Sequence, residues 1–235
     1  MRIWALLLVL SAHSALAGLR DVDFDARPGA HVPLNVALRE GDRAVRLDRY
    51  FGSAPVVLQL GYLGCSNLCS TTLVGADEVL SRTGLVAERD YVALFVSIDP
   101  RDEREAPHRR PGWHMLTGAA SAAAIARAVG FRYAYDKDTG EYAHPAGFLL
   151  LTPDGNVASY FPGVRFDPQL LRSAIERAHT TAPLISPEGS FEQLLLVCFH
   201  DPVAGRYNEA VLLGLRIGMA IFLAALGFVA WRRLR

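Results

Sequence analysis

The feature that most constrains the fold is an apolar run, PVVLQL at residues 55–60, which leads within a few residues into Cys65-Ser-Asn-Leu-Cys69. A run this short and this apolar is typical of a strand buried at the centre of a sheet. The sequence that follows the first cysteine is expected to be helical to about Arg82. A buried strand, a turn that carries cysteines and a helix therefore form the expected core of the chain.

Further strands and helices are expected to alternate along the chain. An apolar–polar alternation on both sides of Glu40-Gly41-Asp42 predicts a β-hairpin, and YVALFVSI at residues 91–98 predicts a second buried strand. The remaining expected elements are strands at 131–135, 148–151 and 157–161, helices at 119–129 and 168–179, a loop at 101–112 and an extended leader at 20–33. This order predicts an α/β fold with a mixed central sheet and helices on its faces. Strand, cysteine-containing turn and helix together are the arrangement of the thioredoxin fold.

The first 17 residues have the pattern of a secretory signal peptide. A positive start at Arg2 precedes an apolar run at residues 3–10 and an Ala-Leu-Ala site that ends at Ala17. An uncleaved membrane anchor is the alternative interpretation. Export would place the cysteines in a compartment where disulfides persist.

The other end of the chain carries a second apolar segment, at residues 211–231. It is long enough to span a bilayer as a helix, and the arginines in the tail at 232–235 place that end in the cytoplasm by the positive-inside rule. We therefore expect a domain at 18–181 on the periplasmic or extracytoplasmic side of the membrane, joined through a linker and juxtamembrane segment at 182–210 to a single C-terminal anchor. The formal net charge is zero, and no basic run suits a nucleic acid.

The C-x-x-x-C spacing places two thiols four residues apart, on one face of a first helical turn. The positive end of a helix dipole favours thiolates, which are the metal-binding and nucleophilic form of cysteine. Soft sulfur ligands select Cu(I), and an added imidazole suits copper in either oxidation state. Cys65 and Cys69 are thus candidates for a redox-linked metal site or for dithiol exchange, and a structural disulfide is the third alternative.

Several stretches resemble SCO/SenC proteins in the same order along the chain. The matching stretches are VVLQLGYLGCSNLCSTTL (56–73), FVSIDPR (95–101), LTG (116–118) and AHPAGFLLLTPD (143–154). The resemblance implies a thioredoxin-like domain in which Cys65, Cys69 and His144 bind copper. It also implies a role in assembling the copper centre of cytochrome c oxidase subunit II, with His144 on a loop just before a late strand. Some family members are discussed as thiol-disulfide reductants of that centre.

The chain departs from the family pattern at several positions. Ser66 and Ser70 stand where the family usually has prolines, and Pro107 and Pro111 lie where it tends to have a helix. The membrane anchor is expected at the C-terminus, whereas the better-known members carry it at the N-terminus. Pro145, just after the candidate histidine, resembles the cis-proline of thioredoxin-like oxidoreductases, and a cis bond there would favour thiol exchange.

Other residues near these motifs have weaker assignments. Asp99 is expected either to orient His144 or to cap a turn, and Tyr62 is expected to pack beside the cysteine loop. The juxtamembrane Cys198 and His200 could contribute to a second copper site, or the cysteine could be a small hydrophobic residue on the bilayer surface. The remaining histidines that lack a partner at metal spacing are expected at the surface; they are His31, His108, His114 and His179.

The leading hypothesis is a copper-binding assembly factor that delivers its metal to oxidase subunit II or to another copper acceptor. The main alternative is an exported, membrane-anchored thiol-disulfide oxidoreductase in which Cys65 is the nucleophile and Cys69 resolves the mixed disulfide. A peroxiredoxin-like activity is weaker because no Thr-x-x-Cys peroxide pocket with a matching arginine is visible. A purely structural tether would leave the cysteine pair unexplained.

Overall fold

A computed structural model describes residues 22–64, 68–104, 110–137, 139–179, 197–198 and 217–218. The expected signal peptide at 1–17 lies outside these residues, as does the expected anchor at 211–231 apart from its residues 217–218. Within the part of the chain that the structure describes, no helix is both long and apolar enough to cross a membrane.

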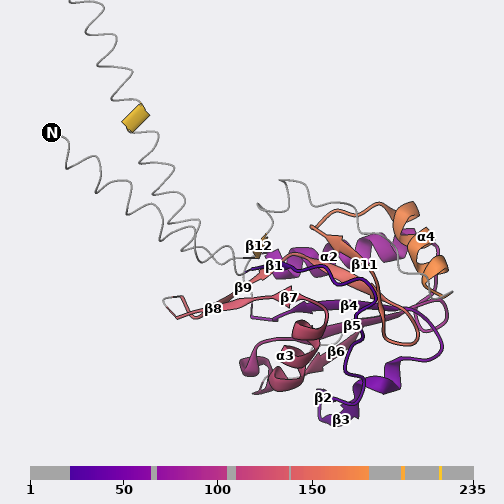
Figure 1. Ribbon diagram of the computed structural model, residues 1–235, viewed down its shortest axis with the longest axis horizontal. Coiled ribbons are helices and arrows are strands. Elements are labelled where there is room, and N and C mark those ends of the chain that lie inside the picture. Colours follow the sequence, from indigo (N-terminus) through magenta and orange to yellow (C-terminus); the bar gives the residue numbers. More distant parts are fainter. Residues whose placement is uncertain are drawn as a thin grey trace, which may run out of the picture.

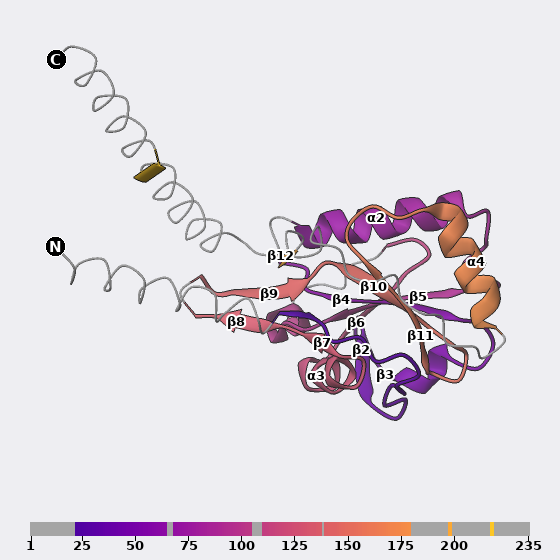
Figure 2. The ribbon, with the colours of Figure 1, turned by 45° about the horizontal axis from the view of Figure 1, so that its top comes forward.

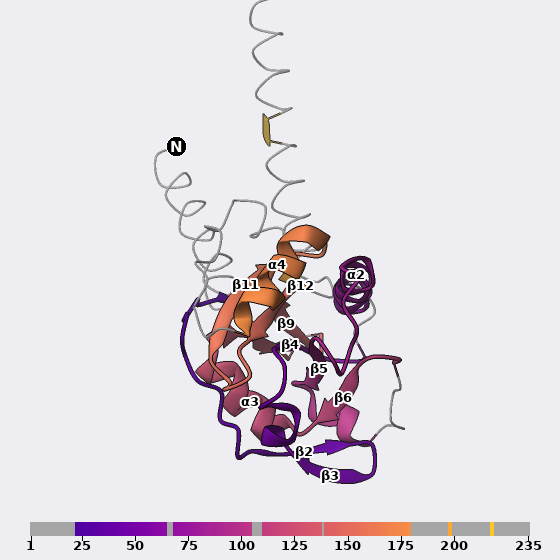
Figure 3. The ribbon, with the colours of Figure 1, turned by 90° about the vertical axis from the view of Figure 1, so that its right-hand side faces the viewer.

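A seven-stranded sheet forms the centre of the domain (Figures 1 and 3). Its strands, in order across the sheet, are β11 (Val157–Pro162), β10 (Gly147–Leu151), β4 (Val56–Gly61), β5 (Val92–Ser97), β6 (His114–Thr117), β2 (Ala37–Glu40) and β3 (Arg43–Arg46). The three middle strands β4, β5 and β6 are parallel, and β10, β11 and the β2–β3 hairpin are antiparallel to their neighbours. The sheet is therefore mixed, as the sequence predicts.

Helices cover both faces of this sheet (Figure 2). Helices α2 (Leu68–Arg82) and α4 (Pro168–Ala178) lie on one face, and α3 (Ala119–Ala128) lies on the other. The start of α4 is fixed by Asp167, whose carboxylate accepts the backbone N–H groups of the first turn. The helices expected at 119–129 and 168–179 are thus confirmed, each ending one residue earlier than predicted.

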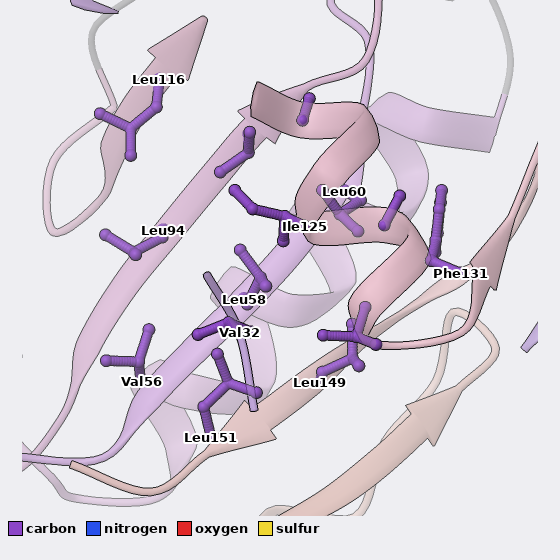
Figure 4. Close-up of a cluster of buried hydrophobic side chains, with 14 of the residues drawn as sticks. Val32, Val56, Leu58, Leu60, Leu94, Leu116, Ile125, Phe131, Leu149 and Leu151 are labelled. Atoms are coloured by element: carbon purple, nitrogen blue, oxygen red, sulfur yellow. The ribbon is translucent and has the colours of Figure 1, made fainter. Parts of the chain in front are cut away.

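Each face of the sheet buries its own apolar core, because β4 and β5 are buried at every position. On the α3 side, Ile125 lies over Leu58, Leu94 and Leu149 of the sheet (Figure 4). Burial of one such leucine or isoleucine side chain stabilises the fold by roughly 1.5–3 kcal/mol. The continuous apolar runs that predict β4 and β5 thus result from packing on both faces.

Two smaller sheets extend from this core. β1 (Asp23–Phe24) pairs with β7 (Phe131–Arg132), and β9 (Glu141–Pro145) lies between β8 (Ala134–Asp136) and β12 (Val197–Cys198). Short 3₁₀ helices follow β3 and β5, at Leu47–Tyr50 and Pro100–Arg104. β9 and β12 lie at the end of the molecule where α2 begins (Figure 2).

Some elements differ from the sequence prediction. The leader expected at 20–33 is extended, but it is also anchored, because β1 pairs with β7 and both Val22 and Val32 are buried. The strand β6 is not predicted, since its sequence HMLT is short and only partly buried. The expected loop at 101–112 begins with the second 3₁₀ helix.

Candidate metal centre

The strand β4 leads the chain directly to the cysteine motif. After Gly61 the buried side chain of Tyr62 is followed by a turn, and α2 begins at Leu68. The backbone of Cys69 therefore lies in the first turn of α2. Cys65 lies outside the described residues, so the expectation that both cysteines share one helical turn stays a prediction.

His144 lies within a strand, β9, and the expectation of a loop before the late strand is wrong. β10 follows at once and pairs antiparallel with β4, with Leu149 opposite Leu58. Residues that precede Leu149 therefore run towards the carboxyl end of β4, where the cysteine turn begins. This topology carries His144 to the end of β4 that leads into the cysteine motif, although 75 or more residues separate the histidine from the cysteines in the sequence.

The imidazole of His144 lies in an aromatic environment at the end of β4. Its ring centroid is 5.8 Å from that of Tyr62, in an edge-to-face arrangement, and 5.8 Å from that of Phe131. A methyl group built on Gly61 would stand 3.7 Å from the Cε1 atom of His144. The ring is therefore held directly against the residues that lead into Cys65.

Burial determines the charge of this ring. His144 is only 1% exposed, and desolvation lowers its pKa from 6.5 to about 4. Its Nδ1 atom lies 3.0 Å from the carbonyl oxygen of Pro145. Because a carbonyl oxygen only accepts, this contact fits the tautomer that carries hydrogen on Nδ1 and the lone pair on Nε2. His144 is thus a neutral imidazole at neutral pH, the form that binds metals.

A buried carboxylate fixes the turn that precedes the cysteines. Asp102, which is 4% exposed, accepts a hydrogen bond from the backbone N–H of Leu63 at 2.8 Å and another from the hydroxyl of Ser97 at 2.5 Å. Asp102 belongs to the 3₁₀ helix after β5, so the end of β5 and the end of β4 are joined through one side chain. This residue is not predicted from the sequence, because it lies in a segment whose charged, proline-rich pattern is typical of a loop.

Asp99 takes the second of its two expected roles. Its carboxylate accepts the backbone N–H of Arg101 at 2.8 Å and forms an ion pair with the guanidinium of the same residue at 2.6 Å. Asp99 thus caps the 3₁₀ helix that starts at Pro100. Tyr62 packs before the cysteine turn as expected, and its hydroxyl donates a hydrogen bond to Glu141 of β9, a residue that the sequence analysis did not identify.

The other histidines have different surroundings. The expectation that His114 lies at the surface is wrong, since the residue is partly buried. Its two ring nitrogens lie 2.5 and 3.0 Å from the carboxylates of Glu40 and Glu88. His31 and His179 are exposed, as predicted, whereas His108 and His200 lie outside the described residues. No peptide bond in the described ranges is cis, so the cis bond considered before Pro145 is absent there.

Among the described residues, the imidazole of His144 is a donor that a soft metal could use. No three His, Cys, Asp or Glu side chains gather at metal-binding distance among those that the structure describes, and the side chains of Cys65 and Cys69 are not among these. The neutral, buried imidazole of His144 fits a copper ion better than a hard cation, which prefers oxygen ligands. The end of β4, which leads into the cysteine motif, and a buried histidine thus lie side by side.

Comparison with known proteins identifies the family. The family model for SCO1/SenC matches residues 38–180, which is more than half of the chain. No curated protein sequence matches the chain.

Solved structures share the fold. A proposed electron transfer protein from Aquifex aeolicus VF5 is 20% identical with a TM-score of 0.56, over 65% of this chain and 95% of that one. ScoI from Arabidopsis thaliana, solved with copper bound, is 19% identical with a TM-score of 0.51, over 65% of this chain and 98% of that one. BsSco, described as a member of the Sco family of cytochrome c oxidase assembly proteins with a disulfide switch, is 17% identical with a TM-score of 0.50, over 66% of this chain and 98% of that one. The chain belongs to the SCO1/SenC family.

Proposed function

We propose that this protein binds copper through Cys65, Cys69 and His144 and delivers it to cytochrome c oxidase subunit II or to another copper acceptor. The observation that carries the proposal is the position of His144, which is buried, neutral and packed against the residues that lead into Cys65. Membership of the SCO1/SenC family and the copper bound to ScoI from Arabidopsis thaliana support the choice of metal.

The residues of the proposed site have distinct roles in copper binding. Cys65 and Cys69 lose their protons when the metal binds, and the N-terminal end of α2 favours the thiolate at the second position. His144 needs no deprotonation, because its pKa already lies well below neutral pH. Asp102 and Tyr62 hold the turn and the imidazole in place, so that little reorganisation is needed when copper enters.

We also propose that the domain lies on the extracytoplasmic face of a membrane. Export through the segment at 1–17 and anchoring through residues 211–231 would hold the domain on the extracytoplasmic face, beside acceptors in the same membrane. Delivery then proceeds by ligand exchange, in which thiolates or imidazoles of the acceptor replace those of this chain one at a time. The protein acts as a carrier in this scheme.

Thiol-disulfide exchange through Cys65 and Cys69 is the second candidate, and the disulfide switch named for BsSco gives it specific support. A transfer experiment separates the two functions. The full chain in detergent, reduced and loaded with Cu(I), is mixed with the copper-free soluble domain of oxidase subunit II, and copper is measured in each protein after separation. Movement of copper to the acceptor supports delivery. Reduction of a disulfide form of the acceptor without any copper transfer would instead establish thiol exchange.

A further inference from the structure

The third cysteine of the chain returns to the candidate metal centre through backbone pairing. β12 pairs antiparallel with β9, so that Cys198 stands directly opposite His144 and Val197 opposite Pro145. The two paired segments are far apart in the sequence, since β9 ends at Pro145 and β12 begins at Val197, with β10, β11 and α4 between them. Residues 197–198, which lie between the domain and the expected membrane anchor, are thus paired with the strand that carries the candidate histidine.

The register decides which of these residues can act together. Residues directly opposite each other in an antiparallel ladder share one face of the sheet, with Cβ atoms about 4.5–5.5 Å apart. Cys198 therefore occupies the register position on the same face as His144, and Val197 occupies the other face. The face that His144 uses is the one that meets Tyr62 and Gly61 at the end of β4.

The backbone alone gives this pairing little stability. β12 is two residues long, and one of the two residues opposite it is Pro145, which has no N–H to donate. So short an edge strand gains few ladder hydrogen bonds and is marginal without a further interaction. A bond from Cys198 to a metal held at His144 would supply that interaction.

We propose that Cys198 is a further copper ligand, which binds as a thiolate to the metal that His144 holds, and that copper in turn fixes the juxtamembrane segment to β9. The inference rests on the proposed copper function and adds a ligand to the same site. On binding, the Cys198 thiol releases its proton to solvent and a sulfur–copper bond forms, so copper is neither oxidised nor reduced. Soft sulfur is the donor that Cu(I) prefers.

The experiment compares the full, reduced chain in detergent with its Cys198→Ser and Val197→Thr variants. The second variant is the control, because it changes the adjacent residue of the same strand, on the opposite face, by a side chain of similar shape. Cu(I) affinity is measured against a competing chelator, and the number of sulfur ligands is measured by X-ray absorption of the copper-loaded protein. Cys198→Met, which keeps a soft sulfur, tests rescue.

We expect copper in the Cys198→Ser variant to have one sulfur ligand fewer than in the wild type. Its Cu(I) affinity should fall by at least roughly 10- to 100-fold, because the loss of even an outer-sphere partner of a metal ligand has an effect of that size. Val197→Thr should keep the wild-type number of sulfur ligands and the wild-type Cu(I) affinity. Cys198→Met should recover part of the affinity that Cys198→Ser loses. An unchanged sulfur count and affinity in Cys198→Ser would overturn the inference.

Two further variants separate this inference from the proposed function. If Cys65→Ser and His144→Ala lose tight binding while Cys198→Ser retains it with all its sulfur ligands, the copper function stands and the role of Cys198 falls. If the wild-type chain binds no copper tightly, both fall together. Protection of residues 197–198 from hydrogen exchange on adding Cu(I), lost in Cys198→Ser, would support docking of β12 by the metal.

Discussion

Tyr62 meets the ring of His144 edge-to-face, with the two ring centroids 5.8 Å apart. The tyrosine is the first residue after β4, and the histidine is the fourth residue of β9, so this contact joins the two strands at the cysteine turn. The phenol hydroxyl also donates a hydrogen bond to Glu141 of the same strand β9. Tyr62 therefore locates the candidate metal ligand relative to the start of the motif.

Replacing Tyr62 by alanine should destabilise the domain by about 3–5 kcal/mol, because a large buried aromatic side chain is lost. Cu(I) affinity should fall as well, since His144 would lose the ring that holds it. Tyr62→Phe keeps the ring contact and removes the hydroxyl, so it should cost only about 1 kcal/mol and leave most of the affinity. Urea denaturation and chelator competition measure the two effects, and equal affinities for the two variants would refute the positioning role.

Replacing Asp102 by alanine should loosen the turn before the cysteines. The change leaves the partly buried N–H of Leu63 without its acceptor, which costs up to about 1–3 kcal/mol. Asp102→Asn keeps an acceptor oxygen and is the matched control, with a smaller loss expected. Cu(I) affinity should follow the same order as stability, whereas wild-type affinity in Asp102→Ala would show that the turn needs no such support.

Gly147 is the first residue of β10, just after the strand that carries His144, and an alanine there should be poorly tolerated. Its φ of 134° is one that L side chains rarely adopt, and an added Cβ would lie 2.3 Å from the carbonyl oxygen of Phe161. We expect a loss of more than about 1–3 kcal/mol in the free energy of unfolding, since strain and a backbone clash combine. Gly64→Ala is the control, because a Cβ at that position meets nothing within 4 Å. Equal stability of the two variants would contradict the geometry of the β9–β10 junction.

The titration of His144 predicts how the stability of the copper-free protein depends on pH. The folded state lowers the pKa of this residue from 6.5 to about 4. Between these values the unfolded chain binds more protons than the folded one, so stability is complete above about pH 6.5 and is lost as the pH falls towards 4. The contribution is on the order of 3 kcal/mol.

The check is denaturant unfolding of the metal-free protein at several pH values, compared with His144→Gln. The variant has no titrating ring, so its stability should fall less than that of the wild type between pH 6.5 and 4. Carboxylates titrate in the same range in both proteins, and the difference between the two curves isolates the histidine. Parallel curves would mean that His144 is not a buried neutral group.

The central strands were predictable because both of their faces are buried. β4 and β5 are apolar throughout, and such runs are visible in a single sequence. β6 was missed because only one of its four residues, Leu116, is fully buried, so HMLT carries no pattern. β9 was missed for a related reason, since its sequence EYAHP includes a proline and its place depends on pairing with distant segments.

The candidate site was predictable only in part. The spacing of Cys65 and Cys69 indicates soft-metal or thiol chemistry by itself, whereas His144 was identified through the resemblance to a family. The supporting groups Asp102 and Glu141 have no local signal, because their partners Leu63 and Tyr62 lie far away in the sequence. Pairing of Cys198 with His144 is likewise a product of the fold alone.

The most direct test of the account is a Cu(I) titration of the full, reduced chain in detergent against a competing chelator, beside His144→Ala and Cys65→Ser. The account predicts one tightly bound copper per chain and weaker binding in both variants, because each removes a ligand of the same ion. The absence of tight binding, or an affinity that does not change in His144→Ala, would contradict the copper site and leave thiol exchange through Cys65 and Cys69 as the better explanation.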